Sequence, residues 1–352
     1  MTPGSAKRAS KLAANLRLSE RVFASTEDKA LLRAVDTGLD QVELELERSV
    51  RFADPIADIS AHYLFDAGGK RIRPMLTLLT AQLGNGNSSD VIMAASAIEI
   101  THLASLYHDD VMDEADRRRG VPAAQTVWGN SVAILTGDLL FARANQIMSR
   151  LGERAIRMQA DTFLRLVLGQ LHETSGPLDG ADPVAHYLQV LADKTGALIA
   201  GAARAGVVFS EAPAELEEPV VQFGERVGVA FQLIDDVIDL SADPIETGKV
   251  PGTDLRAGVV TLPLLKLRGR AHSNPADAAL LARIENELVG SDDPTTGNDI
   301  VAELRAHEVT THTLDEAAKW ARDAAAALEP LPSGSVKNAL IRFTETVVER
   351  TS

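Results

Sequence analysis

Residues 106–120 have the sequence LYHDDVMDEADRRRG, in which five carboxylates run straight into three arginines. The flanking segments are apolar, with AASAIEITHLAS at 94–105 and WGNSVAILTGDLLFARA at 128–144. Mixed charge is common on a solvent-exposed helix face, but such a face is not expected between two segments typical of a protein core. Because buried charges need counterions or a metal, the stretch predicts a functional site on a helix.

The flanks belong to a helical pattern that covers most of the chain. Apolar residues recur at three- and four-residue spacing, the period of an amphipathic helix, and segments rich in Gly, Pro, Ser and Asp separate the helical segments. The helical segments include 91–113, 131–151, 157–175, 185–206 and 219–240. No alternating strand pattern with a hairpin turn stands out. We therefore expect an all-α fold, with residues 1–30 as a flexible N-terminal segment and 31–352 as a single all-α domain.

Composition narrows the range of functions. The 352-residue chain has a formal net charge of −15, which argues against a nucleic acid as partner. It has no cysteine, so disulfides and thiolate metal sites are excluded. No apolar run approaches the roughly 18 residues of a membrane span, and the basic start lacks the apolar core of a signal peptide. We expect a cytoplasmic protein without a membrane span.

The first acidic cluster has the spacing of a metal site. Asp109 and Asp113 are four residues apart and therefore lie on one helix face, a turn from each other, with Asp110 beside them. Like charges at this spacing repel, so a helix that carries them needs a counterion. Carboxylate oxygens suit hard cations, and Mg²⁺ typically takes one or two carboxylates together with water and substrate phosphate.

The acidic pattern recurs far downstream in FQLIDDVIDL, residues 231–240. Here the acidic residues stand among large apolar side chains, which leaves little room for a solvated helix face. The acidic residues are Asp235, Asp236 and Asp239. One DDxxD motif is a weak signal, but two of them on apolar helices predict facing walls of one pocket.

Basic residues accompany both acidic clusters. GGKRIRP at 68–74 places Lys70, Arg71 and Arg73 after two glycines, where a turn can bring them close to an anion. The further basic residues are Arg117, Arg118, Arg119, Lys194 and Lys249. Each of them alone is typical of a surface charge. Beside two carboxylate clusters, however, they indicate a phosphate-rich ligand.

The ordered motifs resemble those of the trans-prenyl diphosphate synthases, the polyprenyl synthetase family. The motifs are GGKRIRP, HDDVMDEADRRRG, GDLLFARA, KTGALIA, FQLIDDVIDL and GKVPGTDLRAGVVTLP. The resemblance implies an isoprenoid-synthase helical bundle around a deep central cavity, usually as a homodimer. It also implies a prenyltransferase that condenses isopentenyl diphosphate with an allylic diphosphate, here farnesyl or geranylgeranyl diphosphate.

The resemblance implies a role for each matching residue. The Mg²⁺ ligands on the allylic diphosphate are Asp109, Asp113 and Asp235, with Asp110 and Asp239 as supporting ligands and Asp236 as a further catalytic aspartate. The residues that bind the allylic diphosphate are Arg118, Lys194, Thr195, Gln232 and Lys249, and of these Lys194 is also catalytic. The residues that bind isopentenyl diphosphate are Lys70, Arg73, His102 and Arg119. Three Mg²⁺ ions are expected when substrate is bound.

Two details qualify these roles. Val259 stands where the family often has a second lysine after the second acidic motif, which removes one diphosphate contact but leaves the reaction class unchanged. Arg118 and Arg119, if helical, point about 100° apart, so that each can serve a different substrate.

The residues before Asp109 predict the length of the product. The growing chain must extend into the apolar cavity along this helix, and short-chain relatives close it with large aromatics four or five positions before the first aspartate. Here those positions are Ser105 and Ala104, and Thr101 is also small. Ile98 is a candidate floor about 16 Å from Asp109. This depth predicts a long-chain product of about six to ten isoprene units, of the kind used for quinone side chains and handed to a membrane.

Other functions remain to be weighed. A short-chain geranylgeranyl diphosphate synthase would differ in product length only. A class I terpene cyclase would carry (N/D)DxxSxxxE, but positions five and nine of the second motif are Asp239 and Asp243. A di-iron bundle needs two ExxH pairs, and Glu99 with His102 is the only one in the chain. A non-catalytic partner subunit tends to lose its acidic motifs, and both are intact here.

Overall fold

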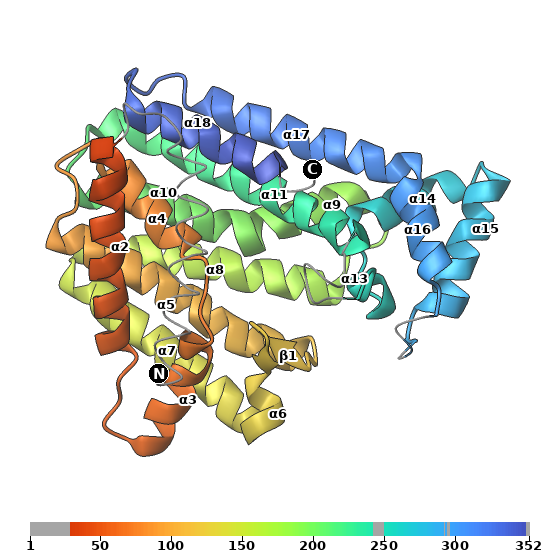
Figure 1. The fold of residues 1–352 in the computed structure, drawn as a ribbon, viewed down its shortest axis with the longest axis horizontal. Helices are drawn as coiled ribbons and strands as arrows, with labels where there is room; N and C mark the ends of the chain where they lie inside the picture. Colours follow the sequence, from red (N-terminus) through yellow and green to blue (C-terminus); the bar gives the residue numbers. More distant parts are fainter. Residues whose placement is uncertain (1–28, 242–249, 292, 294–295, 350–352) are drawn as a thin grey trace. The chain divides into compact units, whose positions relative to one another are not determined.

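The computed structural model describes residues 29–241, 250–291, 293 and 296–349, and these residues are almost entirely helical (Figure 1). The prediction of an all-α fold is therefore confirmed. The chain divides into two compact units, each built from separate stretches of sequence. Unit 1 consists of the residues up to 164, 198–224 and 327–343, and unit 2 of 165–197, 225–326 and the residues from 344 onward. The assignment of 31–352 to one domain and of 1–30 to a flexible segment stays a prediction.

Unit 1 contains both helices that flank the first acidic cluster. Its elements are α2 (Lys29–Ser49), α3 (Pro55–Asp66), α4 (Ile72–Ala81), α5 (Ser89–Met112), β1 (Arg117–Arg118), β2 (Val121–Pro122), α6 (Ala124–Trp128), α7 (Asn130–Arg150), the first part of α8 (Glu153–Ser175), most of α10 (Ala197–Phe209), a 3₁₀ turn (Ala214–Leu216), the start of α11 (Glu217–Ser241) and most of α18 (Ser335–Val348). Helix α5 packs along α7 and also contacts α2 and α4 (Figure 1).

The helix starts follow local capping rules. Asp54 caps α3 by accepting hydrogen bonds from the N–H groups of Ile56 and Ala57, and Pro55 occupies the first helical position, where no N–H is needed. Ser88 caps α5 in the same way by accepting from Val91. These caps fix where α5 begins and therefore where it delivers the acidic residues at its other end.

Helix α4 lies in the core of unit 1, and every residue from Pro74 to its end is buried. A helix that is buried on all sides must satisfy its polar side chains internally. The hydroxyls of Thr77 and Thr80 donate to backbone carbonyls of α10, each at 2.9 Å. Gly206 of α10 allows this approach, since a Cβ there would lie 2.0 Å from the Thr80 hydroxyl. Helix α4 is thereby held firmly at the base of the GGKRIRP turn.

Unit 2 carries the second acidic cluster. Its elements are the end of α8, α9 (Pro183–Leu191), a π-helical segment (Ala192–Gly196), the main part of α11, α13 (Thr253–Arg256), α14 (Leu262–Ala271), α15 (Pro275–Arg283), a second π-helical segment (Ile284–Leu288), α16 (Asn298–Ala306), most of α17 (Glu308–Ala327) and the end of α18. One buried cluster joins α9, α11, α14 and α17 through Leu191, Leu233, Leu262 and Ala317. A second cluster holds α13 to α16 against the end of α11.

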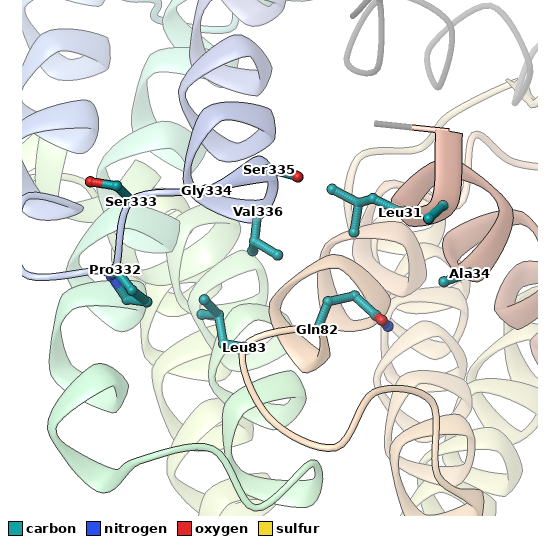
Figure 2. A pocket seen from close by; sticks show the side chains of 10 residues that line it. Leu31, Ala34, Gln82, Leu83, Pro332, Ser333, Gly334, Ser335 and Val336 are labelled. Atoms are coloured by element: carbon teal, nitrogen blue, oxygen red, sulfur yellow. The ribbon is translucent and has the colours of Figure 1, made fainter. Parts of the chain in front are cut away.

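A pocket of about 420 Å³ opens in unit 1 between the start of α2, the end of α4 and the loop before α18 (Figure 2). Leu31, Leu83 and Val336 point into it. None of the described site residues predicted from the sequence lines this pocket, so it is not the predicted reaction site. The deep central cavity stays a prediction. No described helix combines the length and the apolar character needed to cross a bilayer.

Candidate active site

The first acidic cluster lies at the end of α5, as its spacing predicted. Asp109 and Asp110 stand in the last turn, and Asp113 caps the helix by donating its backbone N–H to the carbonyl of Asp109 (2.8 Å). Asp109 is half-buried, Asp110 is buried and Asp113 is exposed. The cluster thus begins in the protein interior and reaches the surface one turn later.

Asp110 is buried as half of an ion pair. Its Oδ1 accepts a hydrogen bond from Arg118 Nε (2.6 Å), and its backbone carbonyl accepts one from the Gln125 side chain (2.8 Å). Burial raises the pKa of Asp110, and the Arg118 guanidinium opposes this shift. Its other oxygen, Oδ2, is buried and accepts no hydrogen bond from any described residue. An acidic helix end with such an oxygen fits a hard cation.

A β-hairpin follows the cluster, so the assumption that Arg118 and Arg119 lie on a helix is wrong. Strand β1 pairs antiparallel with β2, and Arg119 and Gly120 form the two-residue connection. Both have positive φ, 52° and 78°, as a type I′ turn requires. Arg118 and Arg119 still point to different partners, because one is in a strand and the other in a turn. Arg118 binds Asp110, whereas Arg119 Nη1 donates to the Leu64 carbonyl (2.8 Å).

Arg73, His102 and Arg119 are half-buried and share one positively charged environment in unit 1. Burial lowers the pKa of Arg73, and it lowers the pKa of Arg119 to about 10. Burial also holds the pKa of His102 well below its usual range, and the neighbouring arginines strengthen this effect. At pH 7 His102 is therefore neutral while both guanidinium groups stay charged. Together with Lys70, which is exposed, the group fits an anionic ligand.

Arg71 was expected near an anion because of the GGKRIRP turn, but it was not assigned to either substrate. Its guanidinium is buried and forms ion pairs with Glu43 of α2 and Glu99 of α5. It also lies over the Phe65 ring, 5.4 Å from the ring centroid. Glu99, the acid of the ExxH pair, is therefore engaged with an arginine. In the sequence, this ion pair is indicated by an acidic residue, Glu99, at a position where α5 is otherwise buried.

The four residues predicted to limit product length are all buried on α5. Ser105 Oγ donates to a backbone carbonyl of its own helix, and Ala104 is fully buried. Thr101 Oγ1 accepts a hydrogen bond from Gln159 Nε2 of α8 (2.8 Å), so a second helix meets α5 at this depth. Ile98 lies one turn further back. Gln159 carries no sequence signal beyond being a polar residue on a helix face that packs inward.

The second acidic cluster occupies α11 in unit 2. Asp235 is half-buried, while Asp236 and Asp239 are buried. Tyr187 of α9 donates its hydroxyl to Asp236 Oδ2 (2.6 Å). Burial raises the pKa of Asp236 to about 7, the Tyr187 hydrogen bond opposes the rise, and the nearby carboxylate of Asp254 adds to it. Asp236 therefore sits close to the midpoint of its titration near neutral pH.

Asp239 connects this cluster to the segment that follows α11. Its Oδ2 accepts a hydrogen bond from the backbone N–H of Asp254 (3.1 Å), and its carbonyl accepts one from Gly252 (2.9 Å). Gly252 has a φ of 71°, which suits glycine at this reversal. Lys249, predicted to bind the allylic diphosphate, lies outside the described residues. Val259, which replaces the family lysine, is 45% exposed.

Lys194 and Thr195 lie in the π-helical segment between α9 and α10. Such segments are frequent at functional sites and carry one extra residue in the turn. Lys194 forms an ion pair with Glu173 of α8, and Thr195 Oγ1 lies 3.5 Å from Gln232 Oε1 of α11. Thr195 and Gln232, both predicted to bind the allylic substrate, are thus brought together. The sequence pattern predicted a continuous helix here and missed the π-helical turn.

Complete metal sites built from protein groups alone are absent, since no three described His, Asp or Glu side chains converge in either unit. Mg²⁺ does not require such a site, because it usually takes one or two carboxylates and fills the rest of its shell with water and phosphate. Each acidic cluster offers carboxylates of this kind. The donor set therefore fits a Mg²⁺ ion that shares its coordination with a phosphate ligand.

Comparison with known proteins decides the family. The model of the family described as polyprenyl synthetase matches residues 54–293. The chain belongs to the polyprenyl synthetase family. A related polyprenyl synthetase, the nonaprenyl diphosphate synthase of Mycobacterium tuberculosis, is 42% identical over 96% of this chain and 97% of its own length. The chain is accordingly a prenyltransferase, and this similarity supports the long-chain type.

Solved polyprenyl synthetase structures share the fold. The geranylgeranyl pyrophosphate synthase from Corynebacterium glutamicum has a TM-score of 0.80 at 40% identity, covering 93% of this chain and 99% of its own. The polyprenyl synthase from Caulobacter crescentus has a TM-score of 0.81 at 30% identity, covering 95% and 98%. Both were crystallised with calcium and isoprenyl diphosphate. The present chain therefore has the isoprenoid-synthase helical fold.

Proposed function

We propose that this polyprenyl synthetase condenses isopentenyl diphosphate with farnesyl or geranylgeranyl diphosphate in a Mg²⁺-dependent reaction. The product is a long-chain all-trans polyprenyl diphosphate. The end of α5 carries the proposal, because the buried Asp110 meets Arg118 there and keeps one carboxylate oxygen without a described hydrogen-bond donor. A helix end that presents carboxylates and a guanidinium together is suited to a metal-bound diphosphate.

The proposed roles divide between the two units. In unit 1, Asp109 and Asp113 hold Mg²⁺ and Arg118 grips the allylic diphosphate. The proposed isopentenyl diphosphate ligands are Lys70, Arg73, His102 and Arg119, all of them in unit 1. In unit 2, Asp235 is the third metal ligand, Asp239 supports it, and Asp236 assists. The proposed allylic-substrate residues there are Lys194, Thr195, Gln232 and Lys249. We propose three Mg²⁺ ions with substrate bound.

The reaction breaks the C–O bond between the allylic group and its diphosphate and leaves an allylic cation. The double bond of isopentenyl diphosphate supplies the electron pair of the new C–C bond, and the resulting cation loses a proton to the departed diphosphate. Mg²⁺, when bound, neutralises the negative charge that develops on that diphosphate. Arg118 and Lys194 add fixed positive charge at the same place, where such stabilisation contributes most.

Metal dependence is tested with the purified chain, labelled isopentenyl diphosphate and either allylic primer. We expect EDTA to abolish turnover and added Mg²⁺ to restore it. Protein that has been passed over a chelating resin should still bind isopentenyl diphosphate, measured by calorimetry, because the proposed ligands of that substrate are side chains. Full turnover in metal-free buffer would contradict the proposal. Absence of turnover by the chain alone, with turnover after addition of a second protein, would indicate a partner subunit.

Product length distinguishes the long-chain enzyme from a geranylgeranyl diphosphate synthase. Position four before the first aspartate is Ser105, whereas the equivalent position of the second cluster is Phe231. We expect Ser105→Phe to shorten the product to about three or four isoprene units, because a ring one turn before Asp109 closes the path along α5. Phe231→Ser is the matched control and should leave the length unchanged. A wild-type product that stops at farnesyl diphosphate would refute this account.

We propose that the enzyme is a homodimer that pairs through the outer face of α7. Ile134, Leu135 and Leu139 are 41%, 60% and 37% exposed and form an apolar stripe on this helix. An apolar stripe of this kind is typical of a subunit interface. Light scattering at micromolar concentration should give the mass of two chains, and Leu135→Glu should give the mass of one. An active wild-type monomer would overturn the proposal.

We also propose that the enzyme works in the cytoplasm and hands its product to a membrane for a quinone side chain. The described helices include no membrane span, and a long polyprenyl chain is too apolar to accumulate in water. Cell fractionation followed by immunoblotting tests the location. Loss of the membrane quinone after deletion of the coding sequence tests the destination.

A further inference from the structure

The turn before α4 holds an arginine in a backbone conformation that arginine rarely adopts. Arg71, the residue that caps the start of α4, has φ 52° and ψ 34°, in the left-handed region. A side chain with a Cβ is strained there, and glycine is the residue usually found. Strain of this kind persists only where the surroundings hold it in place, and it collects at functional sites.

The side chain of Arg71 is held from three directions. Glu43 of α2 binds its Nε and Nη2, and Glu99 Oε1 of α5 accepts from its Nη1 at 3.1 Å. The Phe65 ring of α3 covers the guanidinium. Arg71 and Glu99 are almost completely buried, 3% and 5% exposed, whereas Glu43 is partly open to solvent. Glu99 is therefore the inner and less screened of the two acidic partners.

The same turn also sets the relative positions of the groups proposed to bind isopentenyl diphosphate. Gly69 packs against two guanidinium groups, since a Cβ there would lie 2.6 Å from Arg71 Nη1 and 3.2 Å from Arg119 Nη2. Arg73 follows in the first turn of α4, and its Nε is buried without a hydrogen-bond acceptor in the described chain. A change in the turn would therefore move Lys70, Arg73 and the contact with Arg119 together.

We propose that Glu99 is a positioning residue for isopentenyl diphosphate, which it never touches. By holding Arg71, it keeps that residue in the left-handed conformation, and so keeps the turn that aims Lys70 and Arg73 at the diphosphate. The inference rests on the function proposed above. The positioning role predicts that isopentenyl diphosphate binds more weakly when Glu99 loses its charge. The electrostatic effect alone has the opposite sign, because removing a negative charge beside three arginines would strengthen the binding of an anion. Weaker binding can follow only from the loss of positioning.

The test uses the full chain with Glu99→Gln, which keeps the shape of the side chain and removes its charge. Isopentenyl diphosphate is titrated by calorimetry in Mg²⁺ buffer without allylic primer, and steady-state kinetics are measured with both substrates. We expect Kd and KM for isopentenyl diphosphate to rise about tenfold, the effect of losing one charge-assisted hydrogen bond. The kcat and the KM for the allylic diphosphate should stay within about twofold.

A pair of substitutions at Arg71 separates the effect of the backbone conformation from the effect of losing the guanidinium charge. Both Arg71→Gly and Arg71→Ala remove the guanidinium, but glycine adopts a φ of 52° without strain and alanine does not. We expect Arg71→Gly to bind isopentenyl diphosphate more tightly than Arg71→Ala. Adding Glu99→Gln to Arg71→Gly should not raise Kd, because the residue through which Glu99 positions the turn is already absent and only the effect of the lost negative charge, which favours anion binding, remains.

Asp277→Asn in unit 2 is the control for general damage, because it also removes a buried carboxylate that binds an arginine. It should lower the unfolding temperature and leave the Kd for isopentenyl diphosphate unchanged. Unchanged or tighter binding by Glu99→Gln overturns the positioning role, and so does equal binding by the two Arg71 variants. If Glu99→Gln does not fold, the Arg71 pair decides. Failure of the wild-type chain to bind isopentenyl diphosphate would instead refute the proposed function.

Discussion

In the first acidic cluster the buried second aspartate, Asp110, accepts a hydrogen bond from a guanidinium, and in the second cluster its counterpart, Asp236, accepts one from a phenol. In both clusters burial raises the pKa of the inner carboxylate and the partner opposes the rise, but the partner is charged at Asp110 and neutral at Asp236, whose pKa is about 7. Two copies of one motif therefore place their inner carboxylates against partners of different charge. The neighbours from other elements, and not the motif, determine this electrostatic environment.

The largest expected effect tests whether the two clusters contribute equally to metal binding. We expect Asp109→Ala and Asp235→Ala each to lower turnover about 10³-fold, equivalent to about 4 kcal/mol of activation free energy, because each removes a proposed primary ligand. Steady-state assays at saturating Mg²⁺ measure this. Asp116→Ala, an exposed aspartate in the same stretch as the first cluster, is the control and should stay near wild type. A loss below tenfold at either position excludes that residue as a primary ligand.

An intermediate effect concerns the two partners of the buried carboxylates. Arg118→Met leaves Asp110 buried opposite a neutral group and should lower the free energy of unfolding by about 3 kcal/mol, at the low end for a buried pair because Arg118 is partly exposed. Tyr187→Phe removes one hydrogen bond to Asp236 and should cost about 1–2 kcal/mol. Urea unfolding at pH 7 compares them. Equal losses of unfolding free energy, or a larger loss for Tyr187→Phe, would show that the charged partner of Asp110 contributes no more to stability than the neutral partner of Asp236.

Sequence reasoning singled out Arg118, but as a diphosphate ligand and not as the partner of Asp110, and it did not single out Tyr187. Arg118 follows its aspartate by eight residues in an unusual charge run, so a local counterion was foreseeable. Tyr187 meets Asp236 only because α9 packs on α11, and a tyrosine in an apolar helix shows no sign of such a contact. The arginine hairpin was missed because RRRG lacks the Asn-Gly or Asp-Gly signal of a type I′ turn.

The helices themselves were predictable because their period and caps are local properties of the chain. All five helical segments taken from the sequence correspond to helices in the structure, with the π-helical turn at Ala192–Gly196 as the exception inside one of them. Buried networks were not predictable, because they depend on which helices meet. The ion pairs of Arg71 with Glu43 and Glu99 join three helices that are separate in sequence. Motif residues of the proposed site could therefore be named from the sequence, whereas contacts that depend on packing could not.

The smallest expected effect uses a third buried aspartate as a reference for the other two. Asp277 of α15 accepts a hydrogen bond from Arg270, which lowers the pKa of Asp277 below its usual 3.8. A lowered pKa means that this pair stabilises the fold above pH 3.8 and that the stabilisation is lost as pH falls through the folded-state pKa. Asp277→Asn should therefore flatten the acid side of the stability profile, measured as unfolding temperature against pH. An unchanged profile would show that Arg270 does not stabilise the charged form.

The π-helical segment Ala192–Gly196 also constrains how the length of this chain can vary. A π-helical turn is, in effect, a one-residue insertion that a helix has absorbed. Deleting one residue would restore regular α-helical hydrogen bonds, but it would rotate the side chains on one side of the deletion by about 100° relative to those on the other. Thr195 would then no longer meet Gln232, although the helix itself would be more regular. A deletion here can thus be well tolerated in folding and still abolish the alignment of two side chains that are proposed to bind the allylic substrate.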